Sequence, residues 1–169
     1  AVVFGCTAAE ALRGPQGEGR LARQVEQATG APCITTLRAV RRRLQRLGAR
    51  RLWLVTPYVP ELAEQVQAWL EAEGLEVVQP VARGLTDPAR AGDLRPEAVV
   101  QMVYEERLQR FQTGRLPVDA TFVAGTHLRA GAVRRRLESV LGVPVVTSAA
   151  AALGAALELL EPLAAGGAP

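Results

Sequence analysis

The sequence contains no lysine and no asparagine, and it has little cysteine, histidine or aromatic side chain. Its two cysteines, Cys6 and Cys33, are too few for a disulfide framework, so we expect reduced thiols and a cytoplasmic protein. No apolar run reaches the roughly 20 residues of a membrane-spanning helix, and no charged segment followed by an apolar one indicates a secretory signal. We therefore expect no membrane partner.

All 20 basic residues are arginine, yet the formal net charge is only +3. Two arginine runs, at residues 41–43 and 134–136, raise the hypothesis of nucleic-acid binding. Each run lies in a segment whose apolar residues fall at helical spacing, which predicts an apolar face toward the core and arginines in solvent. Nucleic-acid surfaces combine a basic stripe with aromatic residues, and aromatics are 4% here. We expect no nucleic-acid partner.

Hydrophobic patterning predicts strands that alternate with helices along the chain. Short apolar runs predict strands at residues 1–6, 32–36, 51–56, 76–81, 120–124 and 144–148. Apolar residues at helical spacing predict helices at residues 20–29, 37–47, 61–73, 96–111, 128–141 and 149–160. This alternation predicts an α/β fold with a mostly parallel, doubly wound sheet.

The remaining segments are predicted to be irregular. Glycine and proline at residues 14–19 and 83–96 predict loops, and the second is long enough to be functional or mobile. Residues 164–169 are expected to be a frayed tail. The first strand is entirely apolar and is predicted to be buried. Because it opens the chain with neither a lead-in segment nor a methionine, we expect the natural protein to be longer.

The chain contains an internal repeat. Residues 4–7 (Phe-Gly-Cys-Thr) end one predicted strand, and residues 123–126 (Val-Ala-Gly-Thr) end another. After the next helix, residues 30–36 (Gly-Ala-Pro-Cys-Ile-Thr-Thr) correspond to residues 142–148 (Gly-Val-Pro-Val-Val-Thr-Ser). Two copies of this unit predict a pseudo-twofold arrangement in which the two turns face each other.

Polar side chains follow several of the predicted strands. Ligands of open α/β sheets bind beyond the carboxyl ends of the strands. A cleft there would be lined by hydroxyls, a thiol, a phenol and the N–H groups of helix starts, which suits a small anion such as a carboxylate. Besides the two turns of the repeat, the expected lining residues are Thr35, Thr36, Thr56, Tyr58, Thr147 and Ser148.

These motifs together resemble the aspartate/glutamate racemase superfamily, and within it the branch of maleate cis-trans isomerases and arylmalonate decarboxylases. The resemblance rests on residues 5–7 (Gly-Cys-Thr), 29–36, 54–58 (Leu-Val-Thr-Pro-Tyr), 125–129 and 137–148. It implies two pseudo-symmetric flavodoxin-like lobes, residues 1–50 with 147–169 and residues 51–146. The family's N-terminal strands and helix are absent, so we expect the first lobe to be incomplete.

The resemblance also implies a site between the lobes that acts on a small carboxylate, uses no metal or organic cofactor, and belongs to a homo-oligomer. Cys6 stands at the position of the first catalytic cysteine, whereas Gly125 stands where the family has a second one. His127 is close enough in sequence to replace that cysteine as acid or base. The substrate-binding positions implied by the family are Thr7, Ala8, Tyr58, Gly125 and Thr126.

Each of these residues also has a purely structural interpretation. Cys6 can be a small buried hydrophobe, and the threonines of the two turns can be ordinary helix caps. Tyr58 can be a surface residue, and His127 an exposed loop residue. Cys33 lies inside an apolar strand and is predicted to be an inert core residue.

We therefore expect a cofactor-independent enzyme that acts on a small carboxylate through the Cys6 thiolate. A single cysteine favours one-sided chemistry, because racemisation by proton transfer usually needs a base on each face of the substrate. Isomerisation by thiolate addition and decarboxylation followed by protonation both remain open. The alternative hypothesis is a non-catalytic carboxylate-binding or structural relative that has lost the second cysteine.

Overall fold

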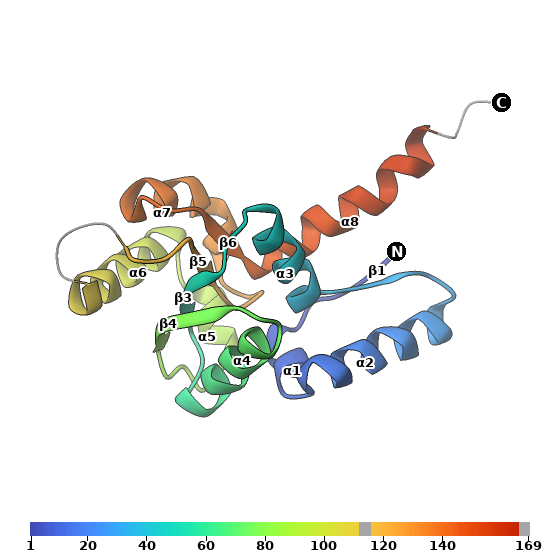
Figure 1. Cartoon of the computed structure of the whole chain (residues 1–169), viewed down its shortest axis with the longest axis horizontal. Coiled ribbons are helices and arrows are strands. Elements are labelled where there is room, and N and C mark those ends of the chain that lie inside the picture. The colour runs from blue at the N-terminus through green and yellow to red at the C-terminus, as the bar shows by residue number, and fades with distance from the viewer. Residues whose placement is uncertain (112–115, 166–169) are drawn as a thin grey trace.

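The computed structural model describes residues 1–111 and 116–165, apart from the side chains of residues 88, 89 and 161–165. Strands and helices alternate along this part of the chain (Figure 1), as the hydrophobic pattern predicts. In chain order the elements are β1 (Val2–Phe4), α1 (Thr7–Ala11), α2 (Gly14–Thr29), β2 (Cys33–Thr35), α3 (Thr36–Arg46), β3 (Arg51–Thr56), α4 (Pro60–Ala72), β4 (Glu76–Ala82), α5 (Pro88–Asp93), α6 (Pro96–Phe111), β5 (Ala120–Val123), the 3₁₀ helix η1 (Arg129–Val133), α7 (Arg134–Leu141), β6 (Val145–Thr147) and α8 (Ser148–Ala165).

Within the described residues, the strands form two parallel sheets. The larger has the strand order β4-β3-β5-β6, and the smaller pairs β1 with β2. Leu52 of β3 lies opposite Val77 of β4 on one side and Ala120 of β5 on the other. Because parallel strands all end at one edge of a sheet, the segments that follow β3, β5 and β6 are brought together.

Helices cover both faces of the larger sheet, because successive side chains of a strand point to opposite faces. Leu52 and Leu54 of β3 belong to a core shared with α3, α4 and α8. Trp53 and Val55 belong to a second core, which is shared with α5, α6, η1 and α7. The doubly wound α/β fold predicted from the sequence is therefore confirmed.

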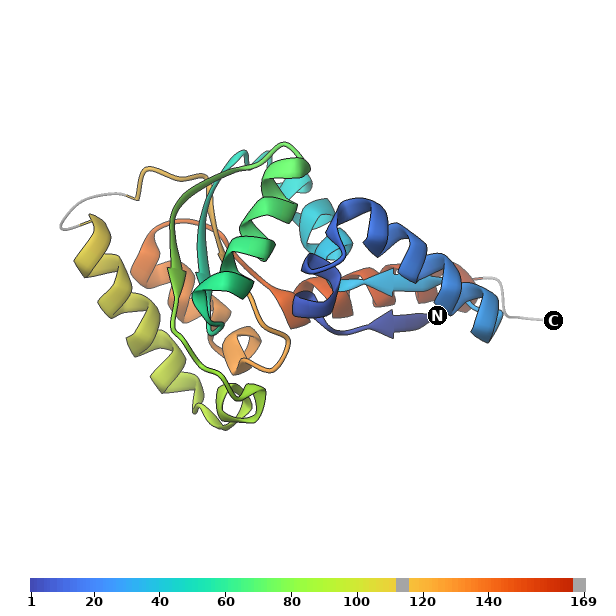
Figure 2. The same ribbon diagram turned by 90° about the horizontal axis from the view of Figure 1, so that it is seen from below.

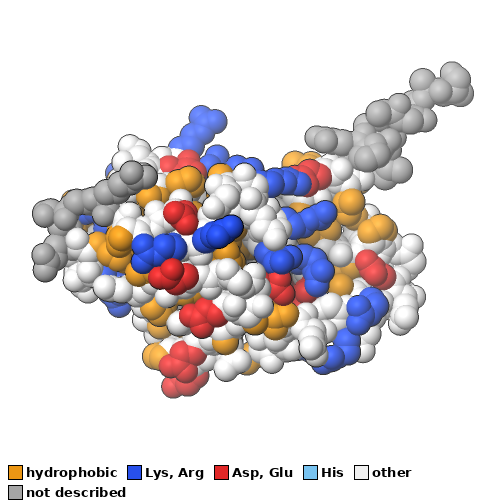
Figure 3. Space-filling model, viewed as in Figure 1, with side chains coloured by type: hydrophobic (Ala, Val, Ile, Leu, Met, Phe, Trp, Pro, Cys, Tyr) orange, Lys and Arg blue, Asp and Glu red, His pale blue; other side chains and the backbone are white. Residues whose placement is uncertain are grey.

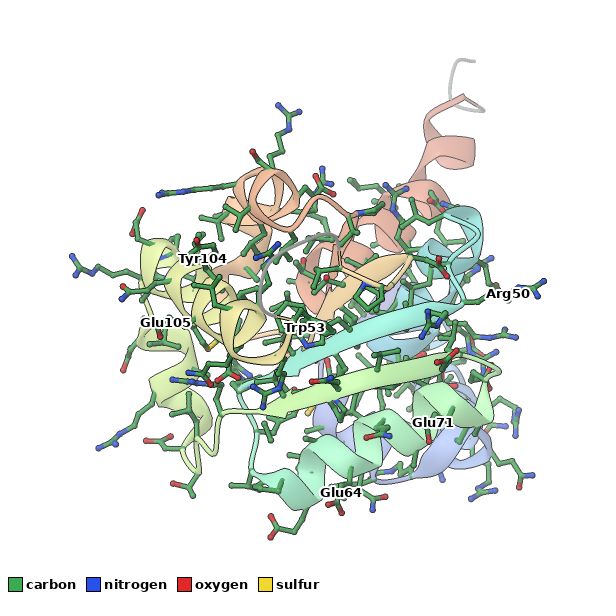
Figure 4. All side chains as sticks on the ribbon, turned by 60° about the vertical axis from the view of Figure 1, so that its left-hand side comes forward. Arg50, Trp53, Glu64, Glu71, Tyr104 and Glu105 are labelled. Atoms are coloured by element: carbon green, nitrogen blue, oxygen red, sulfur yellow. The ribbon has the colours of Figure 1, made fainter. Side chains whose placement is uncertain are left out.

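Trp53 is the largest fully buried side chain of the second core. Its indole meets the ring of Phe111 edge-on, with the ring centroids 5.4 Å apart. Its Nε1 donates a hydrogen bond of 3.1 Å to the carbonyl of Gln79, so the polar tip is satisfied. Figure 4 shows Trp53 between the sheet and α6, while Glu64 and Glu71 extend into solvent from α4.

The smaller sheet lies with α2 and α8 on one side of the molecule, and α1 lies where the two sheets meet (Figure 2). Glu18 of α2 is fully buried; it accepts hydrogen bonds from the hydroxyl of Thr35 and from Nη2 of Arg38, the latter at 2.7 Å. Strand β1 was predicted to be buried, and this is wrong: Val3 is 42% exposed. It lies in a two-stranded sheet that the described elements cover only in part.

The two copies of the repeat are built alike. In the first, the Glu26 carboxylate accepts a hydrogen bond of 3.0 Å from the N–H of Cys33, where β2 begins. In the second, the Glu138 carboxylate accepts one of 3.1 Å from the N–H of Val145, where β6 begins. Each carboxylate lies seven residues before the strand that it caps. Both copies of the repeat therefore begin their second strand with the same carboxylate cap.

Three segments differ from the prediction. Residues 14–19 are helical and begin α2, because Pro15 fits the first turn of a helix and Gly17 allows a close approach. A Cβ on Gly17 would lie 2.7 Å from the Cβ of Arg13. The predicted loop at residues 83–96 contains α5, and the single helix predicted at residues 128–141 is divided into η1 and α7. Residues 166–169 of the predicted tail lie outside the described part.

Among the described helices, none is both long enough and apolar enough to cross a membrane.

Candidate active site

The two turns of the repeat lie side by side, as the sequence predicts. The hydroxyl of Thr126 donates a hydrogen bond of 2.9 Å to the carbonyl of Gly5. The hydroxyl of Thr7 donates one of 3.0 Å to Oγ of Ser148. These pairs are 121 and 141 residues apart in the sequence. The turn after β1 is therefore joined directly to the turn after β5 and to the start of α8.

Ser148 is the residue that joins the three segments. Its side chain is fully buried, and its Oγ accepts a second hydrogen bond, of 3.1 Å, from the N–H of Gly125. The sequence placed Ser148 near the strand ends but did not reveal this bridging role. The signal was available in the repeat, because Thr36 is its counterpart and also bonds to a distant segment: the Thr36 hydroxyl donates to the carbonyl of Phe4 at 3.1 Å.

Cys6 lies between β1 and α1 and is the N-terminal cap residue of that helix. Its side chain is partly exposed, so it is neither a core residue nor a fully open thiol. Its carbonyl accepts a hydrogen bond of 3.1 Å from the N–H of Glu10, which begins the helix. The next residues, Thr7 and Ala8, form the first turn, whose N–H groups have no partner within the helix.

Tyr58 follows the end of β3 and is half-buried beside the Cys6 turn. Burial raises the pKa of its phenol to about 12, and a hydrogen bond with Thr7 opposes part of that rise. The charges of Cys6 and Glu10 raise the pKa further. At neutral pH Tyr58 is therefore a neutral phenol that can donate a hydrogen bond.

Glu10 lies one helical turn beyond Cys6 and was not identified from the sequence. Its side chain is fully buried, and its two carboxylate oxygens accept hydrogen bonds from the N–H groups of Thr36 (2.9 Å) and Leu37 (2.6 Å). Burial raises the pKa of Glu10 to about 7, although the two hydrogen bonds from backbone N–H groups lower it. The charge of Glu18 adds to the rise. Glu10 therefore ties α1 to the start of α3 with a carboxyl group that titrates near neutral pH.

Gly125 adopts a backbone conformation that favours glycine. Its φ is +106°, and a Cβ at this position would lie 3.2 Å from Cγ of Pro57. The corresponding residue of the other turn, Cys6, has a φ of −139°, an extended conformation that any residue adopts. The two turns are equivalent in sequence but differ in backbone, so only one of them presents a thiol.

Several hydroxyls expected to line a cleft are instead used to hold the fold together. Thr35 donates to Glu18, and the hydroxyl of Thr56 donates to the carbonyl of Val81 at 3.1 Å. Thr147 accepts a hydrogen bond of 3.3 Å from the N–H of Ala150, as a helix cap does. All three are buried and their oxygens serve helix starts and strand ends, and the expectation that they line the site stays a prediction.

His127 and Cys33 complete the set of predicted residues. His127 directly follows the second turn and is exposed, and its ring makes no hydrogen bond with the described residues. Cys33 was predicted to be buried in the core, but it is only partly buried. Burial and the neighbouring charge of Glu26 nevertheless raise the pKa of the Cys33 thiol. That shift lowers the fraction of reactive thiolate.

Known proteins resemble the chain along almost its whole length. The family model described as arylmalonate decarboxylase matches residues 1–167. The maleate isomerase of Geobacillus stearothermophilus is 29% identical over 107 residues, which is 60% of this chain and 43% of that protein. The chain spans about half the length of the curated relatives it matches.

Two solved structures are similar in fold as well as in sequence. One is an arylmalonate decarboxylase in its liganded form, with one glycine replaced by cysteine and one cysteine replaced by serine. Its TM-score is 0.84 at 28% identity, over 99% of this chain and 67% of that one. The other is a maleate cis-trans isomerase of Nocardia farcinica, a cysteine-to-serine mutant with a covalently bound succinylcysteine intermediate. Its TM-score is 0.80 at 28% identity, over 96% of this chain and 65% of that one.

The resemblance inferred from the two strand-end turns thus agrees with a family match that covers nearly all residues and with solved structures of the same branch. The relatives have the same α/β fold with parallel sheets, and they are isomerases and decarboxylases. The chain belongs to the arylmalonate decarboxylase family.

Proposed function

We propose that the protein is a cofactor-independent enzyme that acts on a small dicarboxylate through Cys6, with chemistry like that of maleate isomerase. The observation that carries this proposal is the meeting of a partly exposed thiol with a neutral phenol and a second strand-end turn. The succinylcysteine intermediate of the Nocardia farcinica relative supports it, because a cysteine of that enzyme bonds covalently to a four-carbon dicarboxylate.

The proposed reaction needs one nucleophile. Cys6 Sγ, as the thiolate, adds to one olefinic carbon of maleate, and the π electrons move to the neighbouring carbon and its carboxylate. The bond between these two carbons is now single and rotates. The electrons then return, the C–S bond breaks, and fumarate and the thiolate are released. No proton or co-reactant is consumed, because the product is an isomer of the substrate.

The surrounding groups have different roles in this proposal. Tyr58 donates a hydrogen bond to a substrate carboxylate, since its phenol stays protonated at neutral pH. The N–H groups of Thr7 and Ala8 stabilise the charge that develops on the carboxylate of the neighbouring carbon, which is the olefinic carbon that is not attacked. The hydroxyls of Thr7 and Thr126 are already donated to protein oxygens, so they fix the positions of the two turns. We assign no step to the exposed His127.

Decarboxylation is the second candidate, and the backbone of Gly125 favours it. Because Gly125 has no side chain and its backbone conformation favours glycine, this turn offers no acid or base to one face of the substrate. Loss of CO2 from an arylmalonate leaves a carbanion stabilised by the remaining carboxylate, and Cys6 can protonate it from one face. Water then returns the proton to the thiolate. The liganded decarboxylase with one cysteine removed and another introduced supports this alternative.

Proton NMR of the whole chain with maleate and, separately, phenylmalonate tests both reactions. We expect conversion of maleate to fumarate, and Cys6→Ser should lower it about 100-fold or more because the nucleophile is removed. Cys33→Ser is the matched control and should retain the activity, since Cys33 lies on β2 away from the two turns. If phenylmalonate is instead converted to phenylacetate and the conversion depends on Cys6, the assigned reaction becomes decarboxylation and not isomerisation.

A non-catalytic relative makes a different prediction. Such a protein would bind maleate or malonate without turnover and without a covalent adduct at Cys6, which mass spectrometry after acid quenching detects. Activity that survives Cys6→Ser would refute the assignment of the nucleophile.

The lobe division expected from the sequence, residues 1–50 with 147–169 and residues 51–146, is part of this proposal. Its support is the pair of separate sheets, with α1 where they meet and the hydrogen bonds of Thr126 and Ser148 between the strand-end turns.

We also propose that the protein acts as a homo-oligomer. Sedimentation equilibrium checks this, and a monomer at micromolar concentration would contradict it.

A further inference from the structure

The two arginine runs of the sequence contribute to one hollow of the surface, although they are about 90 residues apart. The hollow has a volume of about 270 Å³ and lies between α3, α8 and the edge strand β6. Arg42 and Arg43 of the first run line it, and so does Arg134 of the second. Figure 3 shows basic side chains gathered on this face, over the region where α3 and α8 lie. Cys6 and Tyr58 do not line this hollow.

The charges around the hollow are unbalanced. Four arginines and one glutamate line it, and Glu138 just outside it neutralises Arg134, which leaves a net charge of +2. Arg46 holds the carboxylate of Glu158 through two contacts, the longer of 2.7 Å, and Arg134 is paired with Glu138 on its own helix. Arg42 and Arg43 make no hydrogen bond or ion pair with the described residues. Their charges nevertheless help to lower the pKa of Glu158, so both lie near its carboxylate.

The hollow therefore already holds one anionic group and still has cationic side chains in excess. Its floor is formed by small residues of α8, including Ala151 and Gly154, and no atom lies within 4 Å of a Cβ built on that glycine. This leaves room in front of the guanidinium groups. A volume of about 270 Å³ is near the lower end of the range for ligand pockets, so the fitting ligand is small.

We propose that this hollow is a binding site for a small multivalent phosphate anion, distinct from the Cys6 site. Guanidinium groups form paired, charge-assisted hydrogen bonds with phosphate oxygens. A single carboxylate carries one charge and would leave one of these two charges uncompensated, whereas a diphosphate would neutralise both. The diphosphate would contact Arg42 and Arg43 and would compete with Glu158 for Arg46.

Calorimetric titration of the whole chain with inorganic diphosphate at low ionic strength tests the proposal. We expect one site, and Arg42→Ala/Arg43→Ala should weaken binding about tenfold or more. The matched control is Arg135→Ala/Arg136→Ala, which removes the same charge from exposed positions of α7 that do not line the hollow. The control should stay within about twofold of the parent. Equal weakening by both pairs, or no binding at about 10 mM diphosphate, would overturn the proposal.

Two further measurements sharpen the result. Glu158→Gln removes the competing carboxylate and should tighten diphosphate binding about threefold or more, and weaker binding would contradict the proposed geometry. If the alanine pair does not fold, Arg42→Lys/Arg43→Lys preserves the charge but loses the paired contacts, so unchanged affinity would overturn the proposal. The bound anion can be free diphosphate or the diphosphate group of a nucleotide, and titration with ADP distinguishes the two. Tighter binding than that of diphosphate assigns the site to a nucleotide tail, and equal or weaker binding assigns it to free diphosphate.

Discussion

Replacing Ser148 by alanine removes one oxygen on which two buried donors depend. The Thr7 hydroxyl and the Gly125 N–H both donate to it, at 3.0 and 3.1 Å. A lost hydrogen bond costs about 0.5–1.5 kcal/mol, and a buried donor left without a partner costs about 1–3 kcal/mol. The Thr7 hydroxyl can rotate toward another acceptor, whereas the Gly125 N–H is fixed by the backbone. We therefore expect Ser148→Ala to lower the free energy of unfolding by about 2–4 kcal/mol.

Urea unfolding followed by circular dichroism measures this loss. With a slope near 2 kcal/mol per molar urea, the midpoint should fall by about 1–2 M without a change in slope. Ser139→Ala is the control, because Ser139 is the only other serine and lies exposed on α7. It should change the free energy of unfolding by less than about 0.5 kcal/mol. If Ser148→Ala also changes it by less than that, the inferred bridge does not hold the two turns together.

Gly125→Ala is expected to cost about 1–3 kcal/mol in the same assay, because its φ of +106° is left-handed and the new Cβ would meet a proline ring at 3.2 Å. Gly154→Ala, at an open helical position, should instead stabilise by up to about 1 kcal/mol. The raised pKa of Glu10, about 7, means that this group contributes stability below pH 4.5 that is lost as the pH rises through 7. Between about pH 5 and pH 8 this group should lower the free energy of unfolding by about 2–3 kcal/mol, and this decrease should be absent in Glu10→Gln. If the variant and the parent depend on pH in the same way, the burial argument is contradicted. Iodoacetamide should label Cys6 faster than Cys33, whose pKa is raised by burial and a nearby glutamate; peptide mapping by mass spectrometry checks this, and equal rates would refute it.

The elements predicted best from the sequence are those whose pattern is local. Strand β3 runs from Arg51 to Thr56 as predicted, because a continuous apolar run lies between an arginine pair and a Thr-Pro turn. Helix α6 begins at Pro96, since proline fits the first turn of a helix. The start of α2 was missed because its glycines and proline resemble a loop. No local pattern shows its long-range partners either, since Glu18 accepts hydrogen bonds from Thr35 and Arg38 on other elements.

The same distinction separates the site residues that were predicted from those that were missed. Cys6, Thr7 and Tyr58 follow strand ends, and a repeat brings two such ends together, so their proximity could be inferred. Glu10 and Ser148 act through partners 26 and 141 residues away, and no local pattern shows such pairs. The local pattern does not fix the role of the other threonines either, because a hydroxyl at a strand end serves equally well as a substrate contact or as a cap.

The asymmetry of the site follows from one difference between two copies of a common unit. Both copies place a Gly-x-Pro strand start under a glutamate cap and end a strand in a turn with threonine. In the first copy an extended backbone, with φ of −139°, allows Cys6 to carry its thiol. In the second copy the chain turns at φ of +106° beside Pro57, where a side chain would be strained and crowded. The scaffold is therefore nearly symmetric while only one of its two turns carries a thiol, which is why the function we propose is a single-thiol reaction and not racemisation.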